Sequence, residues 1–467
     1  FPSPVFDTVG TASEIYDASG GLSEFAMESY FGRISLSYLD RYILNMTMRT
    51  DGSSRFAPSD RYGYFPSVSL GWNVSKEPFW KFDRTDLKFR LSYGKTGNQD
   101  GIGNYAWQPL MSGGINYGNN SGMAVTSMGN NTLTWETADQ YDFGFDLGFW
   151  NGKLNMIADV YLKNTNNLLY SMPLHGTSGF TSITNNIGSM RNYGVEFSIN
   201  GHMNLGKVNW TSSFNISHNK NKLTKLLGDD LLPIGSNRAL KVGEELGAFY
   251  LFQMDGIYQY DGEVPQPLYD LGVRAGDVKY HDVDNNGIIN DSDRVLTGSS
   301  NPDFFGGWNN TFKYKGFQLD VFFTYMYGND VYAEWAVTAT RPGYRMAITE
   351  DAAKNRWTAP GSSNKYPRAV NTLCGHNSKN STRFLEDGSF IRLRSLTFSY
   401  TFPQVMLQKI RMKGLRLHVQ GDNLLLFSKY SGWDPEVSKN MDPQYFGVDL
   451  YGVPPSRSVN FGINLSF

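Results

Sequence analysis

Cysteine is nearly absent from this sequence, because Cys374 is the only one among 467 residues. A disulfide needs two thiols, so no disulfide framework can form within the chain, and the single thiol is predicted to be a small structural residue. Runs of about 18 apolar residues are absent as well, which excludes transmembrane helices. A chain that crossed a membrane would therefore have to do so with strands.

Charge is also scarce, with 18% charged residues and a formal net charge of -2. This balance gives the chain no electrostatic means of recruiting nucleic acid, so no nucleic-acid partner is predicted. Aromatic residues, in contrast, make up 15% of the chain, and there are 49 glycines. Length alone suggests two or three soluble domains, but the composition suits one large barrel with aromatic girdles and a polar interior.

The last stretch, 457–467, shows the strand pattern most clearly. Apolar residues alternate there with small polar residues and glycine, the apolar set being Val459, Phe461, Ile463, Leu465 and Phe467. Such a period of two indicates a strand with one oily and one wet face. About 9–11 residues are enough for a tilted strand to cross a bilayer, and only a closed barrel avoids unpaired backbone groups in lipid. The alternative is an edge strand of a soluble sandwich.

Thirteen segments with this alternation are predicted as membrane strands. They are 33–38, 43–49, 62–75, 86–96, 135–149, the segment after Asn151-Gly152, 191–203, 207–219, 303–315, 317–328, 389–402, 413–424 and 457–467. Short turns join them at one end and long segments at the other, among them 97–132, 164–190 and 220–302. Short periplasmic turns and long extracellular loops are typical of outer-membrane barrels.

The alternation of short turns and long loops also tests whether residues 248–252 form a membrane strand. Residues 248–252 look like a strand, but a fourteenth crossing would reverse the direction of every later one. We therefore predict that 220–302 is one extracellular excursion with a local β element. Residues 1–30 are predicted to be loop, and the opening Phe1-Pro2-Ser3-Pro4 indicates the interior of a longer polypeptide.

A twelve-residue motif at 282–293 carries the sharpest chemical signal. It follows the calcium-loop pattern D-x-[DN]-x-[DN]-G, with Gly287 supplying the tight turn. Calcium prefers many oxygen ligands, and the predicted set is Asp282, Asp284, Asn286, the carbonyl of Ile288, Asn290 and Asp293. Asp293 replaces the usual bidentate glutamate, which shortens the reach and would weaken binding. The alternative is an Asx-rich turn that holds no metal; a structural Ca2+ is the favoured interpretation.

No catalytic residues and no organic cofactor are predicted. The acidic residues Glu136, Asp139, Asp142 and Asp146 are close in sequence, but a period of two makes Asp142 and Asp146 polar lining of a lumen. The histidines lack ligand spacing. Aromatic residues of the long segments could stack on sugars, meet a partner or pack the loops together; they are Trp107, Tyr117, Tyr258, Tyr260, Trp335, Tyr344, Trp357 and Trp433.

Several short segments of the sequence resemble motifs of the SusC/RagA family of TonB-dependent outer-membrane transporters. They are Arg49-Thr50-Asp51-Gly52-Ser53-Ser54-Arg55-Phe56, Phe65-Pro66-Ser67-Val68-Ser69-Leu70-Gly71-Trp72, Arg90-Leu91-Ser92-Tyr93-Gly94-Lys95-Thr96-Gly97-Asn98, Gly188-Ser189-Met190-Arg191-Asn192-Tyr193-Gly194-Val195-Glu196, Gly276-Asp277-Val278-Lys279-Tyr280 and Phe390-Ile391-Arg392-Leu393-Arg394. They are spread from about residue 33 to the end, so the resemblance covers nearly the whole chain.

The resemblance implies an all-β fold, a plugged transmembrane β-barrel of 22 strands in the outer membrane of a Gram-negative bacterium. Residues 1–467 would then be the carboxy-terminal portion of one barrel domain, with the plug and the first strands outside this sequence. The implied partners are a SusD-like lipoprotein lid, TonB acting through the plug, the amino-terminal part of the same barrel and outer-membrane lipid.

The implied function is active import of oligosaccharides or peptides, driven through TonB and without covalent chemistry. The chain is accordingly predicted not to be an enzyme. Two alternatives belong to other classes: a passive porin or surface adhesion barrel, and a soluble β-rich glycan-binding or hydrolytic protein. Which oligosaccharide or peptide is carried does not follow from the sequence.

Overall fold

A computed structural model describes residues 22–226, 231–343, 346–370, 375–408, 412–439 and 445–467. Cys374 lies outside these residues, as does most of the predicted loop 1–30. The chain divides into two compact units. Unit 1 comprises Phe1–Gly148, Ala158–Gly194 and Asn221–Asp229, and unit 2 comprises Phe149–Ile157, Val195–Lys220 and Asp230–Phe467. Each unit is described by itself below.

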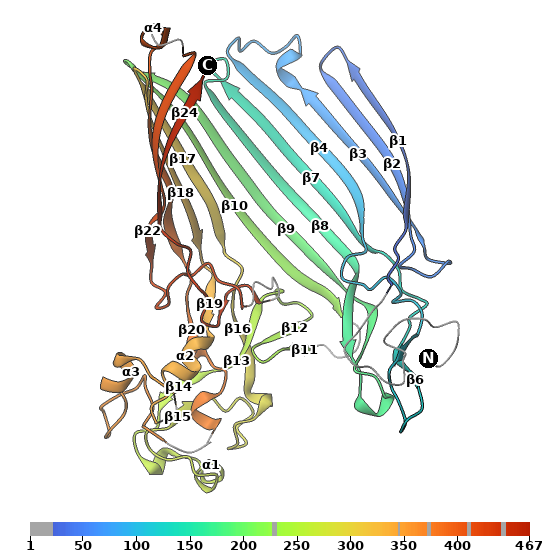
Figure 1. Ribbon diagram of the computed structural model, residues 1–467, viewed down its shortest axis with the longest axis vertical. Helices are drawn as coiled ribbons and strands as arrows, with labels where there is room; N and C mark the ends of the chain where they lie inside the picture. The colour runs from blue at the N-terminus through green and yellow to red at the C-terminus, as the bar shows by residue number, and fades with distance from the viewer. Residues whose placement is uncertain (1–21, 227–230, 344–345, 371–374, 409–411, 440–444) are drawn as a thin grey trace. The chain divides into compact units, whose positions relative to one another are not determined.

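Thirteen long strands form one sheet, which confirms the thirteen predicted from alternation (Figure 1). Hydrogen-bonded neighbours follow the order β1-β2-β3-β4-β7-β8-β9-β10-β17-β18-β21-β22-β24. The bounds are β1 Met27–Tyr38, β2 Tyr42–Ser53, β3 Tyr62–Asn73, β4 Thr85–Asn98, β7 Glu136–Phe149, β8 Leu154–Pro173, β9 Ser182–Leu205, β10 Val208–Leu226, β17 Phe304–Tyr314, β18 Phe317–Tyr327, β21 Phe390–Thr401, β22 Gly414–Ser428 and β24 Ser458–Ser466. The described strands form an open sheet with β1 and β24 at its edges.

Several predicted strand ends were wrong. The predicted loop 164–190 is largely strand, because β8 runs to Pro173 and β9 starts at Ser182. In the same way β1 starts at Met27, six residues before the predicted strand, and β10 continues to Leu226. Asparagine side chains explain the first error, since Asn186 Nδ2 donates to the carbonyls of Thr134 and Asn167, at 2.9 and 2.8 Å. These bonds satisfy backbone groups in a segment with little apolar alternation.

The short turns have the backbone conformation that tight hairpins need. In the turn between β17 and β18, Lys315 and Gly316 have φ values of 44° and 89°. Tyr314 pairs with Phe317 across this two-residue turn. Positive φ at both central residues matches the right-handed twist of the flanking strands. The turn therefore fixes the register of the whole β17–β18 pair, as its Lys-Gly sequence predicts.

The last strand keeps the two faces that its sequence predicts. The apolar residues of β24 pair with apolar residues of β22, as in Val419↔Phe461 and Leu417↔Ile463, and Phe461 is 83% exposed. The opposite face is polar, with Gln420↔Asn460 and Asp422↔Ser458. A wide row of exposed apolar side chains on one face is what a sheet facing lipid requires.

Three segments of unit 2 fold together into what we call the loop assembly, which comprises the described residues of 231–302, 329–389 and 429–457. One core joins all three, because Phe249, Tyr332 and Val448 pack in the same cluster. A second core lies within the first segment, around Phe252, Tyr280 and Ile289. The segment 248–252 is β13 of a separate four-stranded sheet, so the prediction that it is not a membrane strand is confirmed.

Short elements build the loop assembly. Its strands are β11 Leu231–Ile234, β12 Arg238–Lys241, β13 Ala248–Phe252, β14 Met254–Ile257, β15 Val278–Tyr280, β16 Arg294–Ser299, β19 Asp330–Ala333, β20 Leu385–Asp387 and β23 Val448–Asp449. Its helices are α1 Gln266–Asp270, α2 Glu334–Ala339 and α3 Glu350–Lys354, whereas α4 Gln404–Leu407 lies in the turn between β21 and β22. The described part of the chain has no helix of the length and apolarity that crossing a bilayer would take.

Unit 1 has a smaller core of its own. Phe56, Phe65, Ile102, Leu133 and Trp135 pack together, with the rings of Phe56 and Trp135 5.0 Å apart. The predicted loop 97–132 contains a further hairpin, β5 Leu110–Gly113 and β6 Met123–Ser127. The long segments of both units therefore contain secondary structure and hydrophobic cores of their own.

Candidate functional site

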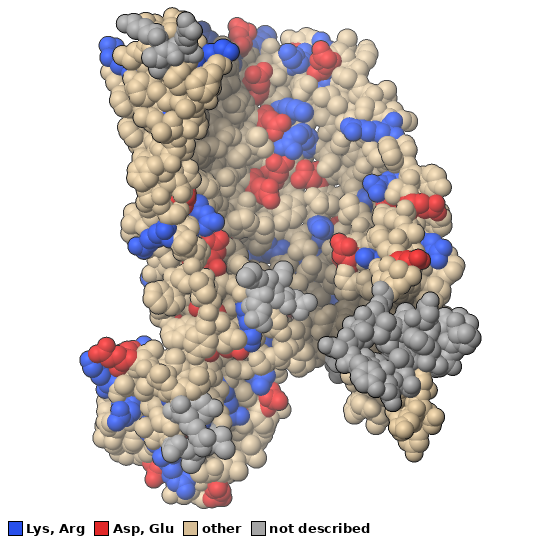
Figure 2. Space-filling model, in the orientation of Figure 1, with Lys and Arg blue, Asp and Glu red and all other residues tan. Residues whose placement is uncertain are grey.

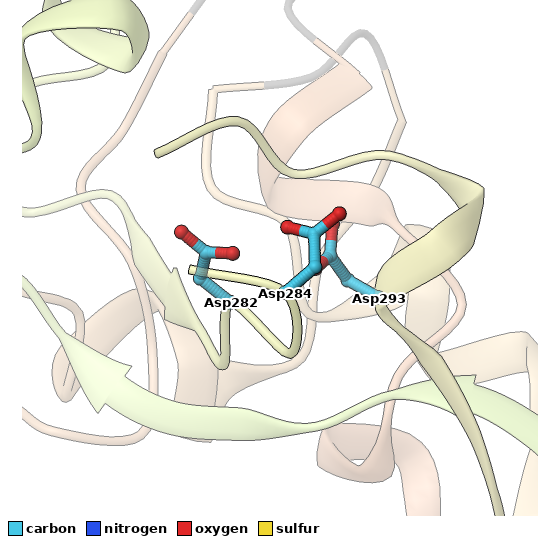
Figure 3. Close-up of side chains that lie close together, drawn as sticks. All are labelled: Asp282, Asp284 and Asp293. Atoms are coloured by element: carbon cyan, nitrogen blue, oxygen red, sulfur yellow. The ribbon is translucent and has the colours of Figure 1, made fainter. Parts of the chain in front are cut away.

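The predicted calcium loop brings three carboxylates together. Asp282, Asp284 and Asp293 each contribute an oxygen, and these oxygens lie within 4.8 Å of one another (Figure 3). Asp282 and Asp284 come from the turn after β15, whereas Asp293 precedes β16. Ligands on opposite sides of one Ca2+, at 2.3–2.6 Å each, lie about 5 Å apart. The spacing therefore fits oxygen ligands around a single hard cation.

Backbone hydrogen bonds hold the carboxylates in place. Gly287 N donates to Asp282 Oδ2 at 2.7 Å, and its φ of 78° is the left-handed conformation that glycine favours. Asp293 is fully buried and accepts from the backbone N–H groups of Val283 and Asn290, at 2.9 and 2.8 Å. The turn geometry predicted from Gly287 is thus present.

The pKa of Asp282 reflects this arrangement. Burial raises the pKa of Asp282, but the N–H groups donated by Gly287 and Asn286 outweigh it, so that the net shift is downward. The described ion pairs include none with Asp282, Asp284 or Asp293. The three carboxylates could therefore act as oxygen ligands of a metal cation.

The other predicted ligands are arranged less directly. Asn286 Oδ1 accepts from Ile288 N at 2.7 Å, and Asn290 Oδ1 accepts from Ser292 N at 2.8 Å as the cap of a short 3-10 turn. Ile288 is 43% exposed. The structure therefore brings together the acidic members of the predicted set, while Asn286 and Asn290 already hold the loop in shape.

An ion pair between the partly exposed Arg368 and a buried carboxylate was missed by sequence reasoning. Arg368 donates two hydrogen bonds to Asp277, from Nε to Oδ1 at 2.8 Å and from Nη2 to Oδ2 at 2.9 Å. Asp277 is 2% exposed and also accepts from Asn377 Nδ2 at 2.9 Å. The only sequence signal that included Asp277 was the segment 276–280, which resembles a motif of the SusC/RagA family. The pair joins parts of the loop assembly that are 91 residues apart.

His376 gives the loop assembly a predicted pH dependence. It is 8% exposed, with Nε2 2.7 Å from the carbonyl of Val278. Burial lowers the pKa of His376 below its ordinary value of 6.5. An opened loop assembly restores the ordinary value and binds a proton more readily. Stability is therefore complete above about pH 6.5 and falls below it, by at most about 1.4 kcal/mol per pH unit, until the lowered pKa is reached.

Hydrogen exchange over 278–280, corrected for intrinsic rates, measures this effect. We expect faster exchange at pH 5 than at pH 7.5 in the unaltered protein, and a flatter profile in His376→Gln. His281→Gln is the matched control, because His281 is exposed and pairs only with Asp255, at 3.2 Å. An equal loss of pH dependence in both variants would contradict the role of His376.

Asp146, one of the acidic residues predicted to be polar lining, belongs to an ion-pair cluster of unit 1. Arg90 Nη2 is 3.0 Å from Asp146 Oδ1 and 2.8 Å from Asp159 Oδ1. Gly144 allows this contact, because a Cβ there would lie 2.1 Å from Asp159 Oδ1. Figure 2 shows charged side chains gathered over the strands that Figure 1 labels β4, β7 and β8. Pairing with Arg90 fits the prediction that Asp146 lines a polar wall.

Six of the eight aromatic residues named for the long segments divide into two groups, and Trp107 is half-buried. Trp335 Nε1 donates to Tyr430 Oη at 3.1 Å, Trp357 Nε1 donates to Gln259 Oε1 at 3.1 Å, and Tyr258 is buried. These three pack the loop assembly. Tyr117, Tyr260 and Trp433 are 89%, 61% and 80% exposed and are free to meet a ligand or partner. Tyr344 lies outside the described residues.

Comparison with known proteins gives the family. The model of the TonB-dependent receptor-like β-barrel matches residues 3–424. The chain belongs to the TonB-dependent receptors. It is 34% identical over 471 residues to TonB-dependent receptor P3 of Formosa agariphila and 31% identical over 470 residues to TonB-dependent receptor SusC of Bacteroides thetaiotaomicron. These alignments cover 96% and 94% of this chain, but 46% and 43% of the relatives.

The structure is also similar to that of a solved transporter. The RagAB peptide transporter superposes with a TM-score of 0.83 at 27% identity, over 95% of this chain and 48% of that one. The predicted SusC/RagA resemblance is therefore confirmed, and with it the outer membrane of a Gram-negative bacterium as the location. The chain spans about half the length of the curated relatives it matches.

Proposed function

We propose that this TonB-dependent receptor imports oligosaccharides or peptides actively across the outer membrane, together with a SusD-like lipoprotein lid. The observation that carries the proposal is the similarity to the RagAB peptide transporter over 95% of this chain. The relation to SusC points in the same direction. Import of this kind moves the ligand without breaking a covalent bond, so no catalytic role is proposed.

The loop assembly supports the lid. Its three segments share one core, so they form a shaped surface rather than separate loops. Exposed aromatic rings remain on it, among them Tyr260 and Trp433. Such rings stack on sugars and are enriched at protein interfaces. The loop assembly would therefore meet the lid or the captured ligand.

Uptake measured in cells tests the proposal. Cells with the full-length receptor and its neighbouring lipoprotein would be given labelled oligosaccharides or peptides, with and without TonB. We expect uptake to require TonB and to fall when the lipoprotein is removed. Uptake that persists without TonB would overturn the proposal and favour a passive porin. Normal uptake without the lipoprotein would overturn only the proposed role of the lipoprotein as a lid, and not the TonB-dependent import.

We also propose that the 282–293 loop holds a structural Ca2+. The supporting observation is the spacing of the Asp282, Asp284 and Asp293 oxygens, within 4.8 Å of one another. Asp282, Asp284 and Asp293 would be ligands, with Asn286, the carbonyl of Ile288 and Asn290 completing the sphere. The ion would offset the repulsion among three carboxylates and clamp the loop against the core around Ile289.

Asp284→Ala should weaken Ca2+ binding at least tenfold, because Asp284 is exposed and its side chain bonds only within the loop, to Asn286. Chelation should speed protease cleavage of the loop in the unaltered protein but not in this variant. Asp291→Ala is the matched control, since Asp291 occupies a position that is not a ligand in the motif. Unchanged protease sensitivity and metal content after chelation would overturn the site.

A further inference from the structure

The short turns of unit 2 carry a charge pattern that transport does not explain. Four turns join its strands at the end opposite the loop assembly, at residues 149–154, 204–208, 313–317 and 402–414. Their described residues include five exposed lysines and no Asp or Glu, the lysines being Lys153, Lys207, Lys313, Lys315 and Lys413. In an outer-membrane barrel the short turns face the periplasm. The described residues of these turns therefore carry five positive charges, at the level of the inner-leaflet headgroups.

A groove lies beside these turns: Lys153 lines it, and Lys207 lies three residues after Asn204, which also lines it. It measures about 450 Å³ and is lined mainly by Trp150, Lys153, Leu154, Ile199, Gly201 and Trp210. Lys153 follows the turn between β7 and β8, and Lys207 lies in the turn between β9 and β10. Backbone pairing holds these turns together, since His202 N donates to Lys153 O at 2.7 Å. The groove is of the size of small-ligand sites, which run from about 300 to 1,000 Å³.

The groove opens on the apolar face of the sheet. Trp210 is stacked on Phe312, with ring centroids 6.2 Å apart and an interplanar angle of 4°. Phe312 alternates along β17 with Thr311, which bonds Asp320 on the polar face. Trp150 is 58% exposed, and Gly201, which has no side chain, lines the groove. Tryptophan is typical of the boundary between acyl chains and headgroups.

We propose that this groove binds one phospholipid of the periplasmic leaflet with an anionic headgroup, such as phosphatidylglycerol. Charge complementarity selects the occupant: Lys153 and Lys207 meet the phosphate and the net negative headgroup, while one acyl chain lies across Gly201 between Leu154 and Trp210. A lysine near a membrane surface contributes about fivefold to the binding of anionic lipid. A zwitterionic lipid with the same chains would gain far less.

A substitution of Gly201 distinguishes lipid binding in the groove from general electrostatic attraction of anionic lipid to the basic turns. A Cβ built at Gly201 meets only Leu154 Cδ1, at 3.8 Å, so a larger side chain can be added without a backbone clash. Gly201→Leu would fill the groove and leave all five lysines in place. Loss of lipid binding in this variant requires a groove, whereas loss in a lysine variant requires only charge.

Native mass spectrometry of the purified full-length receptor, titrated with phosphatidylglycerol or phosphatidylcholine of identical chains, tests the proposal. We expect at least tenfold tighter binding of phosphatidylglycerol, about 25-fold weaker binding in Lys153→Gln/Lys207→Gln, and at least fivefold weaker binding in Gly201→Leu. Lys241→Gln/Lys279→Gln is the matched control, because both lysines are exposed in the loop assembly. Its binding should be unchanged.

Equal binding of the two lipids would overturn the proposal, as would unchanged binding in Lys153→Gln/Lys207→Gln. Unchanged binding in Gly201→Leu would overturn the groove as the site. Preference for lipid A over phosphatidylglycerol would also overturn it, because lipid A occupies the outer leaflet. Circular dichroism of each variant, compared with the unaltered protein, shows that a loss of binding is not a loss of fold.

Discussion

Replacing Phe461 by arginine should destabilise the membrane-inserted receptor by about 2–4 kcal/mol, the cost of an arginine on the lipid face near the middle of a bilayer. Phe461 lies at the centre of β24, is 83% exposed and pairs with Val419 on the apolar face. The measurement is the denaturant midpoint of the full-length receptor refolded into lipid vesicles, together with the amount assembled in cells.

Asn460→Arg is the control, because Asn460 is the neighbouring residue on the opposite face. Its Nδ2 donates to Asp422 Oδ2 at 3.3 Å, so an arginine at position 460 could form an ion pair with Asp422. We expect a change within about 0.5 kcal/mol. If the two arginines were equally harmful, the two faces of β24 would not differ in environment, and the account of the sheet as a membrane wall would fail.

Arg368→Met should destabilise the loop assembly by about 3 kcal/mol. Removing one partner of a buried ion pair costs about 3–5 kcal/mol, because the other charge stays buried without compensation. The lower end applies here, because the Arg368 side chain is 30% exposed and because Asn377 and the backbone N–H of Arg274 still donate to Asp277. Limited proteolysis should show about a hundredfold faster cleavage of the loop assembly.

Arg356→Met is the matched control for the same substitution. Arg356 is exposed and donates only to the carbonyl of Ala353, at 2.9 Å. Its proteolysis rate should match that of the unaltered protein. A second variant, Asp277→Asn/Arg368→Met, should recover part of the lost stability, because it leaves no uncompensated charge. Failure of this rescue would show that packing of Arg368, and not its charge, stabilises the loops.

The membrane strands could be predicted from the sequence because their signal is local. Successive side chains of a strand point to opposite faces, so the alternation in 457–467 already contains both surfaces of β24. Tight turns then fix the register, as Lys315-Gly316 does for β17 and β18. Physical chemistry within about ten residues was enough for these elements, and the thirteen strands follow from it.

The ends of the strands could not be predicted in the same way. In 164–190 the backbone is held by side chains from far along the chain, as when Asn130 Nδ2 donates to the carbonyl of Thr184 at 3.0 Å. Asparagine favours turns in isolation, so its presence predicts a loop. Here the asparagines extend a sheet, because their amides pair with backbone groups that the sequence does not place beside them.

The candidate site shows the same division. Asp282, Asp284 and Asp293 belong to one twelve-residue motif, and the structure gathers them as its spacing predicts. The Asp277–Arg368 pair joins residues 91 positions apart, so no spacing pattern announces it. The sequence does not predict the substrate, because the exposed aromatic rings of the loop assembly are equally suited to a sugar and to a peptide.

Whole-cell labelling tests the central claim most directly: that a membrane wall places the loop assembly outside the cell and the short turns in the periplasm. In a full-length receptor with Cys374→Ser, a membrane-impermeant maleimide would be applied to Leu271→Cys, which replaces a residue 71% exposed in the loop assembly, and to Lys207→Cys in a short turn. The account predicts labelling of the first in intact cells, and of the second only after the outer membrane is permeabilised. Labelling of Lys207→Cys in intact cells, with Leu271→Cys protected, would contradict it.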